Sequence, residues 1–388
     1  MVSRRLRVCV VGVLVAALAG CGGAGDGADG GKQEITFGGL VTTSGVNAYV
    51  GVSASKAYTV AVNMVNADPA RYLGSADRSV KVEAKDAGET APTAVALARS
   101  MAADSKYVGL VGPSTSPQAL ALGPLAQSSK IPLVVPGSPA PGITDAGDRV
   151  FQMAATNDVL AEQVIQAVVP KQHLTKVGVI YSPDNNANLV AGKSAINALA
   201  KAGAAVVEFT IPATDQDYTS AVAKMRDANC DGVFIATNSG GVAAAIIQAE
   251  RTGYHPQWLG GPMFANDVVF KNAGQSAVGS VITTDYNPNL RTDLNDAFRS
   301  AYQKEANTPA DVYAAQAFST VLTLAAAIKS IPASEKVTRD KLTSALATAK
   351  DVEVVVSDGK LSMGADRRTQ INAALLRLDS AGKFTPYE

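Results

Sequence analysis

The sequence predicts an α/β protein that forms two doubly wound lobes, each a parallel sheet with helices on both faces. Short apolar runs without alternation recur along the chain, which is typical of strands covered on both faces. Amphipathic segments separate these runs, so strands and helices alternate, and this alternation favours right-handed βαβ units. The chain has 388 residues, of which 47% are hydrophobic, and this length and composition favour two packed domains over one.

The N-terminal segment 1–21 predicts a secretion signal. Three arginines, Arg4, Arg5 and Arg7, precede the apolar run VCVVGVLVAALA, which is shorter than the roughly 20 apolar residues that span a bilayer. The segment ends in LAGC at Cys21, a pattern that resembles the lipobox of bacterial lipoproteins, where cleavage leaves the cysteine first and its thiol carries lipid. We therefore expect lipid attachment at Cys21. The alternatives are a plain signal peptide with an incidental cysteine and a twin-arginine signal.

Residues 22–33 predict a flexible tether between this anchor and the folded body. They begin with GGAGDGADGG, which has nothing to bury and no helix or strand pattern. The body is expected from about Glu34 onward.

The predicted strands and helices then follow one another through the body. Unbroken apolar runs predict the strands, and apolar residues at three- and four-residue spacing predict the helices. The strands are expected at 35–41, 108–111, 131–135, 177–181, 206–211 and 232–236. The helical faces are expected at 54–65, 94–101 and 242–249, and the most apolar helix at 312–331. Gln316, Ser319 and Thr320 indicate that this last helix lies in a core and does not span a membrane.

Polar and glycine residues follow four of these strands. The strand at 108–111 continues into GPSTS, and three others continue into PGSPAPG, SPDNNAN and TNSGG. Ligands of open α/β sheets bind outside the carboxyl ends of the strands, so we expect these four ends to face one cleft. The hydroxyls of Ser114, Thr115 and Ser116 either cap a helix or hold an anion at its N-terminus, and the two roles use the same physics.

The remaining composition excludes several classes of function. The 34 basic and 34 acidic residues give a net charge of zero, so nothing in the charge suggests nucleic acid as a partner. Cys230 is the one cysteine of the body, cannot form an internal disulfide, and is expected to act as a small hydrophobe. His173 and His255 have no partner at metal-ligand spacing, so neither a metal nor a cofactor is expected.

Three enzyme signatures come close and fail. NLVAGKSA contains Gly-Lys-Ser like a P-loop, but Ala187 replaces the first glycine of that motif, and the segment lies too far beyond its strand. GVSAS and GPSTS lack the second glycine of the G-x-S-x-G elbow, and FGGLVTTSG lacks the spacing of a dinucleotide-binding turn. We therefore expect no enzymatic activity.

The order of these motifs resembles the type I periplasmic binding proteins, in the branched-chain amino acid branch that feeds ABC importers. The likeness runs from ITFGGLVTTSG through KDAGETAPTAVALARSMAADSKYVGLVGPSTS, IPLVVPGS, VFQMAATNDVLAEQ and AIIQAERTGYHPQWLGG to DGKLSMGADRR. It implies two lobes joined by three crossings, near Thr156, Thr284 and Ser362. The first lobe would hold 34–156 plus 285–361, and the second 157–284 plus 362–388.

The resemblance also implies which residues hold the ligand. Hydroxyls and N–H groups of the first lobe bind the ligand carboxylate in this family, and the matching positions are Ser114, Thr115 and Ser138. In the second lobe, fewer positions match the family's residues. The family often has an acidic residue at the start of the first helix of this lobe, and Asp158 or its neighbour Asn157 matches it. Asn186 stands where the family commonly has an aromatic residue. The other expected contacts are Tyr49, which is offset by one position, Ser116, Asn238, Ser239 and Phe264.

The position that binds the ammonium group in the amino-acid binders departs from the family. Those proteins have a carboxylate near Pro262 or Met263, where this chain is apolar. A buried ammonium without a partner is strongly disfavoured. Either Asp158, Asp184 or Asp285 replaces the missing carboxylate, or the ligand is not an α-amino acid.

The resemblance therefore implies a monomeric, lipid-anchored solute-binding protein on the extracytoplasmic face of a bacterial membrane. It would capture a small carboxylate-bearing solute, such as an amino acid, an amide or a related organic acid, by hinge closure, and would deliver it to an ABC permease. A sensor that presents the same closed state to a membrane receptor is an alternative. A structural surface lipoprotein is another, and it predicts a filled apolar cleft.

Overall fold

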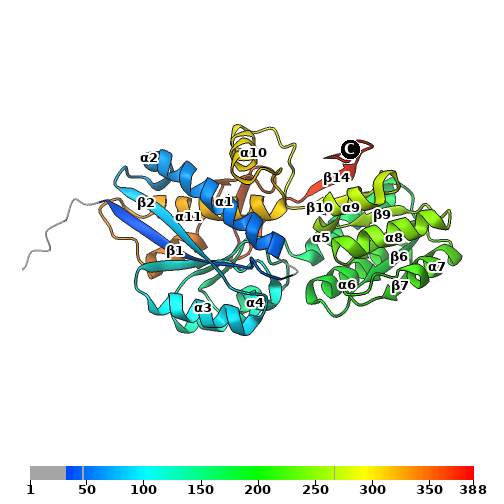
Figure 1. Cartoon of the computed structure of the whole chain (residues 1–388), viewed down its shortest axis with the longest axis horizontal. Coiled ribbons are helices and arrows are strands. Elements are labelled where there is room, and N and C mark those ends of the chain that lie inside the picture. The colour runs from blue at the N-terminus through cyan, green and yellow to red at the C-terminus, as the bar shows by residue number, and fades with distance from the viewer. Residues whose placement is uncertain (1–31, 46–47, 266) are drawn as a thin grey trace, which may run out of the picture. The chain divides into compact units, whose positions relative to one another are not determined.

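Two separate β-sheets organise the structure, a computed structural model that describes residues 32–45, 48–265 and 267–388 (Figure 1). The expected signal segment, the lipid site at Cys21 and the tether as far as residue 31 lie outside the described residues. Both sheets have parallel strands with helices on both faces, so the predicted doubly wound α/β class is confirmed.

The first sheet has five parallel strands. Across the sheet they are β2 (Arg78–Asp86), β1 (Gln33–Val41), β3 (Tyr107–Val111), β4 (Leu133–Val135) and β5 (Val150–Gln152). The helices around it are α1 (Ala48–Ala67), α2 (Pro69–Leu73), α3 (Ala91–Ala103), α4 (Ser116–Ser128), α10 (Asp293–Ala306), α11 (Val312–Ser330) and α12 (Arg339–Ala347). Successive residues of a strand point to opposite faces. Val134 of β4 therefore packs in the core under α1, α10 and α11, while Leu133 and Val135 pack in the core under α3 and α4 (Figure 1).

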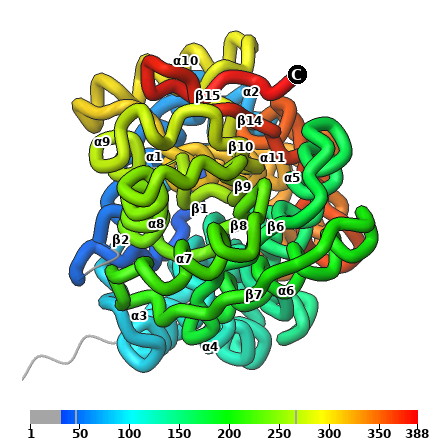
Figure 2. Tube along the Cα trace, turned by 90° about the vertical axis from the view of Figure 1, so that its right-hand side faces the viewer, coloured from blue at the N-terminus to red at the C-terminus, as the bar shows by residue number. Residues whose placement is uncertain are grey.

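The second sheet has seven strands. Across the sheet they are β15 (Phe384–Pro386), β14 (Ala374–Leu378), β10 (Val281–Thr284), β9 (Gln257–Gly260), β8 (Gly232–Ala236), β6 (Lys176–Tyr181) and β7 (Ala205–Thr210). Strand β14 pairs antiparallel with β10, β15 pairs antiparallel with β14, and the other pairs are parallel. Figure 2 shows β15, β14 and β10 at one edge of this sheet. The core on one face includes α5 (Asn157–Lys171) and α6 (Asn186–Lys201), and the core on the other includes α7 (Thr219–Asp227), α8 (Ser239–Arg251) and α9 (Asp267–Ala273).

Every strand predicted from an apolar run is present, as β1, β3, β4, β6, β7 and β8. One expectation about burial is wrong, because β7 is the outer strand of its sheet and alternates between exposed and half-buried residues. The outer strand β2 was not predicted, since its sequence RSVKVEAKD mixes charged and apolar residues. Edge strands have one neighbour, so a continuous apolar run is neither needed nor diagnostic there.

Helix α11 is the central helix of the first sheet's larger core. Within the described residues it alone has the length and hydropathy of a membrane span, and most of it is buried inside the fold. The prediction of a core helix is therefore confirmed. Three 3-10 turns complete the fold, η1 (Ile143–Ala146), η2 (Pro262–Ala265) and η3 (Gly274–Ala277).

The chain passes from one sheet to the other at three places. The first passage lies between β5 and α5, and the second between β10 and α10. The third passage was expected near Ser362, but the strand that contains Ser362 does not pair with the second sheet. Strand β12 (Lys360–Met363) pairs with β11 (Val352–Glu353) and β13 (Thr369–Gln370), and Thr369 Oγ1 donates to Met153 O of the first passage at 2.7 Å. Because these bonds hold 360–370 beside β5, the chain joins the second sheet only at β14.

Candidate functional site

A cavity of about 310 Å³ lies at the carboxyl ends of strands from both sheets. The loops after β3 and β4 line it through 114–117 and Gly137. The loops after β6, β8 and β9 line it through Asn185, Asn238 and 261–263. The four polar strand ends singled out in the sequence therefore meet at one cavity, as the rule for open α/β sheets requires.

The N-terminal ends of six helices, α1, α4, α5, α6, α8 and α11, border this cavity. The side chains of Asn185 and Asn238 cap α6 and α8 by accepting backbone N–H groups. Helix α4 has no such side-chain cap, because the hydroxyl of its N-cap residue Thr115 donates to Gln118 Oε1 at 2.8 Å. No Lys, Arg or His is found among the described residues that line the cavity. An anion at these helix starts would therefore be held by N–H groups and hydroxyls, without a basic side chain from the described lining residues.

The first-lobe hydroxyls divide into two groups. Ser114, Thr115 and Ser116 line the cavity, where a ligand oxygen can reach them. Ser138 does not line it: its side chain is fully buried and its Oγ donates to Pro113 O at 3.5 Å. The neighbours of Ser138 on each side, not its hydroxyl, face the cavity.

Of the expected second-lobe contacts, Asn238 lines the cavity, and so does Asn157, the alternative to Asp158. Asn186 is exposed, and its place is taken by the N-cap residue before it and by the two residues that follow it. Asp158 lies one position beyond Asn157, which does line the cavity, and one step along a helix turns a side chain by about 100°. Ser239 and Phe264 are turned away as well, since Ser239 Oγ donates to Met263 O and Phe264 is buried in the core.

Tyrosine rings form an apolar wall of the cavity. Tyr49 lines it as expected, and its ring meets that of Tyr313 edge to face, with centroids 5.8 Å apart. Burial raises the pKa values of both hydroxyls, so they stay neutral near pH 7 and act as hydrogen-bonding groups. Phe234 and Met263 extend this wall from the second sheet.

A buried carboxyl, Asp285, stands in the second passage between the sheets and also lines the cavity. Its Oδ2 accepts hydrogen bonds from Gln316 Nε2 at 2.7 Å and from Ala155 N at 3.2 Å. Burial raises the pKa of Asp285 to about 6, and these two neutral donors lower it only in part. Asp158 and Asp184, the other acids considered for an ammonium partner, do not line the cavity.

Sequence reasoning missed several lining residues. Gln316 was interpreted only as a polar residue of a core helix, and Tyr313 and Glu89 were not singled out. The available signal was the amide of Gln316 in an otherwise apolar helix, because a buried polar side chain needs a partner. Nothing in the local sequence shows that Asp285 is that partner, since the two residues belong to different elements.

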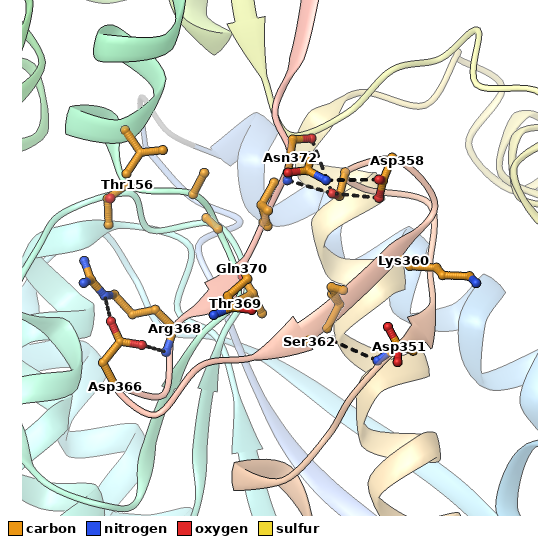
Figure 3. Close-up of a pocket in the computed structure, with 16 residues that line it drawn as sticks. Thr156, Asp351, Asp358, Lys360, Ser362, Asp366, Arg368, Thr369, Gln370 and Asn372 are labelled. Carbon is orange, nitrogen blue, oxygen red and sulfur yellow. Dashed lines mark hydrogen bonds and ion pairs between the residues drawn. The ribbon is translucent and has the colours of Figure 1, made fainter. Parts of the chain in front are cut away.

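Figure 3 shows a second hollow, of about 570 Å³, at the passages between the sheets. Two of its carboxylates are already bonded to other residues of the hollow. Asp366 Oδ2 accepts from Arg368 Nε at 2.7 Å, and Asp358 Oδ2 accepts from Asn372 Nδ2 at 3.1 Å. No aromatic ring is among the described residues that line this hollow, so the first cavity is the better candidate for a solute.

Comparisons with known proteins agree with this geometry. The profile of a family described as periplasmic binding protein matches residues 34–383. The Leu/Ile/Val-binding protein homolog 8 of Brucella abortus is 23% identical over 291 residues, which cover 69% of this chain and 70% of the relative. The Leu/Ile/Val-binding protein of Citrobacter freundii is 26% identical over 218 residues, which cover 54% of this chain and 57% of the relative.

Solved structures share the fold across nearly the whole chain. The branched-chain amino acid transporter substrate-binding protein LivJ of Streptococcus pneumoniae, in complex with isoleucine, aligns with a TM-score of 0.78 and 22% identity, covering 91% of this chain and 98% of that one. A solute-binding protein of an ABC transporter from Rhodopseudomonas palustris, in complex with 4-hydroxybenzoate, aligns with a TM-score of 0.78 and 20% identity, covering 92% and 96%. The chain therefore belongs to the periplasmic binding protein family, in its type I, branched-chain amino acid branch.

Proposed function

We propose that this chain is the solute-binding lipoprotein of an ABC importer and that it captures a small solute with a carboxylate group. The observation that supports this most strongly is the convergence of uncharged donors on one cavity. Ser114 and Ser116 lie where α4 begins without a side-chain cap, and a carboxylate there would accept their O–H groups and the N–H groups of the first turn.

The rest of the cavity favours a small, partly apolar solute. Tyr49, Tyr313, Phe234 and Met263 offer apolar and ring surface for the body of the ligand. The related structures named above hold isoleucine or 4-hydroxybenzoate, and each of these solutes carries one carboxylate and an apolar body. Lobe closure about the three passages would bury the solute and present the closed form to a permease.

Thermal unfolding of the purified protein with a solute panel tests this proposal. The panel contains branched-chain and aromatic amino acids, their des-amino acids, benzoate, 4-hydroxybenzoate and the corresponding uncharged amides. A carboxylate-bearing ligand at 100 times its Kd should add about 2.7 kcal/mol to the free energy of unfolding. Stabilisation by the amides and not by the carboxylates would contradict the proposal.

The anchor, the partner and the oligomeric state belong to the same proposal. Lipid on Cys21 would hold the protein at the extracytoplasmic face of the membrane, beside the ABC permease that receives the solute. The cavity is lined by one chain, so a monomer would suffice for binding.

A further inference from the structure

Two buried acceptor atoms at the cavity have no hydrogen-bond partner. They are Oδ1 of Asp285 and Oε1 of Gln316, and both side chains line the cavity. The side chains are 1% and 6% exposed. A buried acceptor left without a donor destabilises a protein, so such atoms are normally paired.

The orientation of these two atoms is set by the bond between the side chains. Gln316 Nε2 donates to Asp285 Oδ2, so the Gln316 amide turns its oxygen away from the carboxylate. That oxygen faces the loop after β4, since a Cβ added to Gly137 would lie 2.8 Å from Oε1. Gly137 lines the cavity together with the hydroxyl-bearing start of α4. The unpaired acceptors therefore belong to the same cavity as the proposed carboxylate contacts.

The chemistry of the pair selects a cationic donor. A hydroxyl would satisfy one acceptor but leave the negative charge of Asp285 without a counter-charge. An ammonium group would supply several N–H donors and a compensating charge, which a buried carboxylate strongly favours. The family's usual carboxylate is absent at Pro262 and Met263, so a cationic group there would meet an apolar surface.

We propose that Asp285 and Gln316 form the ammonium subsite, which makes the solute an α-amino acid. This inference rests on the proposed function, because the carboxylate subsite at the start of α4 supplies the other end of the ligand. A further consequence concerns closure. The backbone oxygen of Asp285 accepts Ser357 N at 2.7 Å and its side chain accepts Ala155 N, so the ammonium would bind where separate passages of the chain meet.

Isothermal titration calorimetry at pH 7.5 tests the subsite. The probes are leucine, isoleucine and phenylalanine, each compared with its des-amino acid: 4-methylpentanoate, 3-methylpentanoate and 3-phenylpropanoate. For the best-bound pair, the amino acid should bind about 10–100-fold more tightly, the effect of a hydrogen bond to a charged group. Asp285→Asn should reduce that preference to within about threefold, because it keeps the shape and removes the charge. Asp184→Asn, a carboxylate outside the cavity, should keep the preference.

Proton release provides a second test that needs no variant. With a pKa near 6, Asp285 is about half protonated at pH 6, and an ammonium would drive it to the charged form. Binding of the amino acid at pH 6 should therefore release about half a proton, measured in buffers of different ionisation enthalpy. The hydrogen-bond donors to the Asp285 side chain are the Gln316 amide and the Ala155 N–H, and neither titrates. Glu89 and the two tyrosines are the other titratable side chains described at the cavity, so Glu89→Gln should retain the release.

The outcomes separate this inference from the proposed function. Equal or tighter binding of the des-amino acids, or an unchanged preference in Asp285→Asn, would overturn the ammonium subsite and leave the carboxylate site in place. An absence of binding by every carboxylate probe would overturn both.

Discussion

Replacement of Asp285 by asparagine should stabilise the protein without its ligand at neutral pH. The carboxyl is buried and faces only neutral hydrogen-bond donors, so its charged form is disfavoured relative to water. Asparagine has nearly the same volume, and its side-chain oxygen can still accept the bonds from Gln316 and Ala155. The charge is therefore removed at little structural cost.

The size of the effect follows from the raised pKa. Burial takes the pKa of Asp285 from an ordinary value of 3.8 to about 6, a difference of about two pH units. Each unit corresponds to about 1.4 kcal/mol, so the carboxylate destabilises the folded state by about 3 kcal/mol at pH 7.5. Below pH 4 the group is protonated in both states and has no effect. Between pH 4 and pH 6 the folded state binds more protons than the unfolded state, so this contribution lowers stability as the pH rises.

Urea unfolding of the wild type and Asp285→Asn at pH 4 and pH 7.5 measures this directly. The variant should be more stable by about 3 kcal/mol at pH 7.5, and the difference should nearly vanish at pH 4. Asp184→Asn is the matched control, and its difference from the wild type should not follow this pattern. A variant that is less stable than the wild type at pH 7.5, or a difference independent of pH, would refute the reasoning. The expected result would mean that the wild type keeps a destabilising charge at its cavity, as a residue retained for binding does.

Three further predictions concern binding, anchoring and packing. Ser114→Ala should weaken binding of the best carboxylate ligand about tenfold or more by calorimetry, whereas Ser138→Ala should change it less, because only the first hydroxyl lines the cavity. Cys21→Ala should move the protein from the membrane fraction to the soluble fraction, while Cys230→Ala, which removes a buried thiol of the body, should stay with the membrane; membrane retention of both would contradict the lipid site. Arg78→Met should lower the free energy of unfolding by about 3 kcal/mol in urea, because the guanidinium donates to five backbone carbonyls and the variant leaves them unpaired. A loss under about 1 kcal/mol would show that water replaces those bonds.

Much of the site could be predicted because ligand-facing loops follow strands in the chain. The hydroxyls of Ser114 and Ser116 were found in this way, since a strand end and a helix start fix where they lie. The assignment of single ligand-binding positions from the family resemblance was less accurate where helices begin. Asn186 was chosen where its neighbour Asn185 lines the cavity, and of the two alternatives Asp158 and Asn157 it is Asn157 that lines it. One position on a helix changes the direction of a side chain.

The sequence alone determined the class of fold and the interior strands β1, β3, β4, β6 and β8, because burial on both faces imposes a continuous apolar pattern. The interior strands β9 and β10 were not predicted. The sequence also indicated the cavity's general place, since the strand ends carry small polar residues. The tertiary structure alone decided which polar groups act together. Asp285 and Gln316 are separated by 30 intervening residues, and only the packing of α11 against the passage after β10 brings their side chains to 2.7 Å. It likewise decided that Ser138 faces the core and that the third passage follows β13, because hydrogen bonds between distant segments are not encoded in any local pattern.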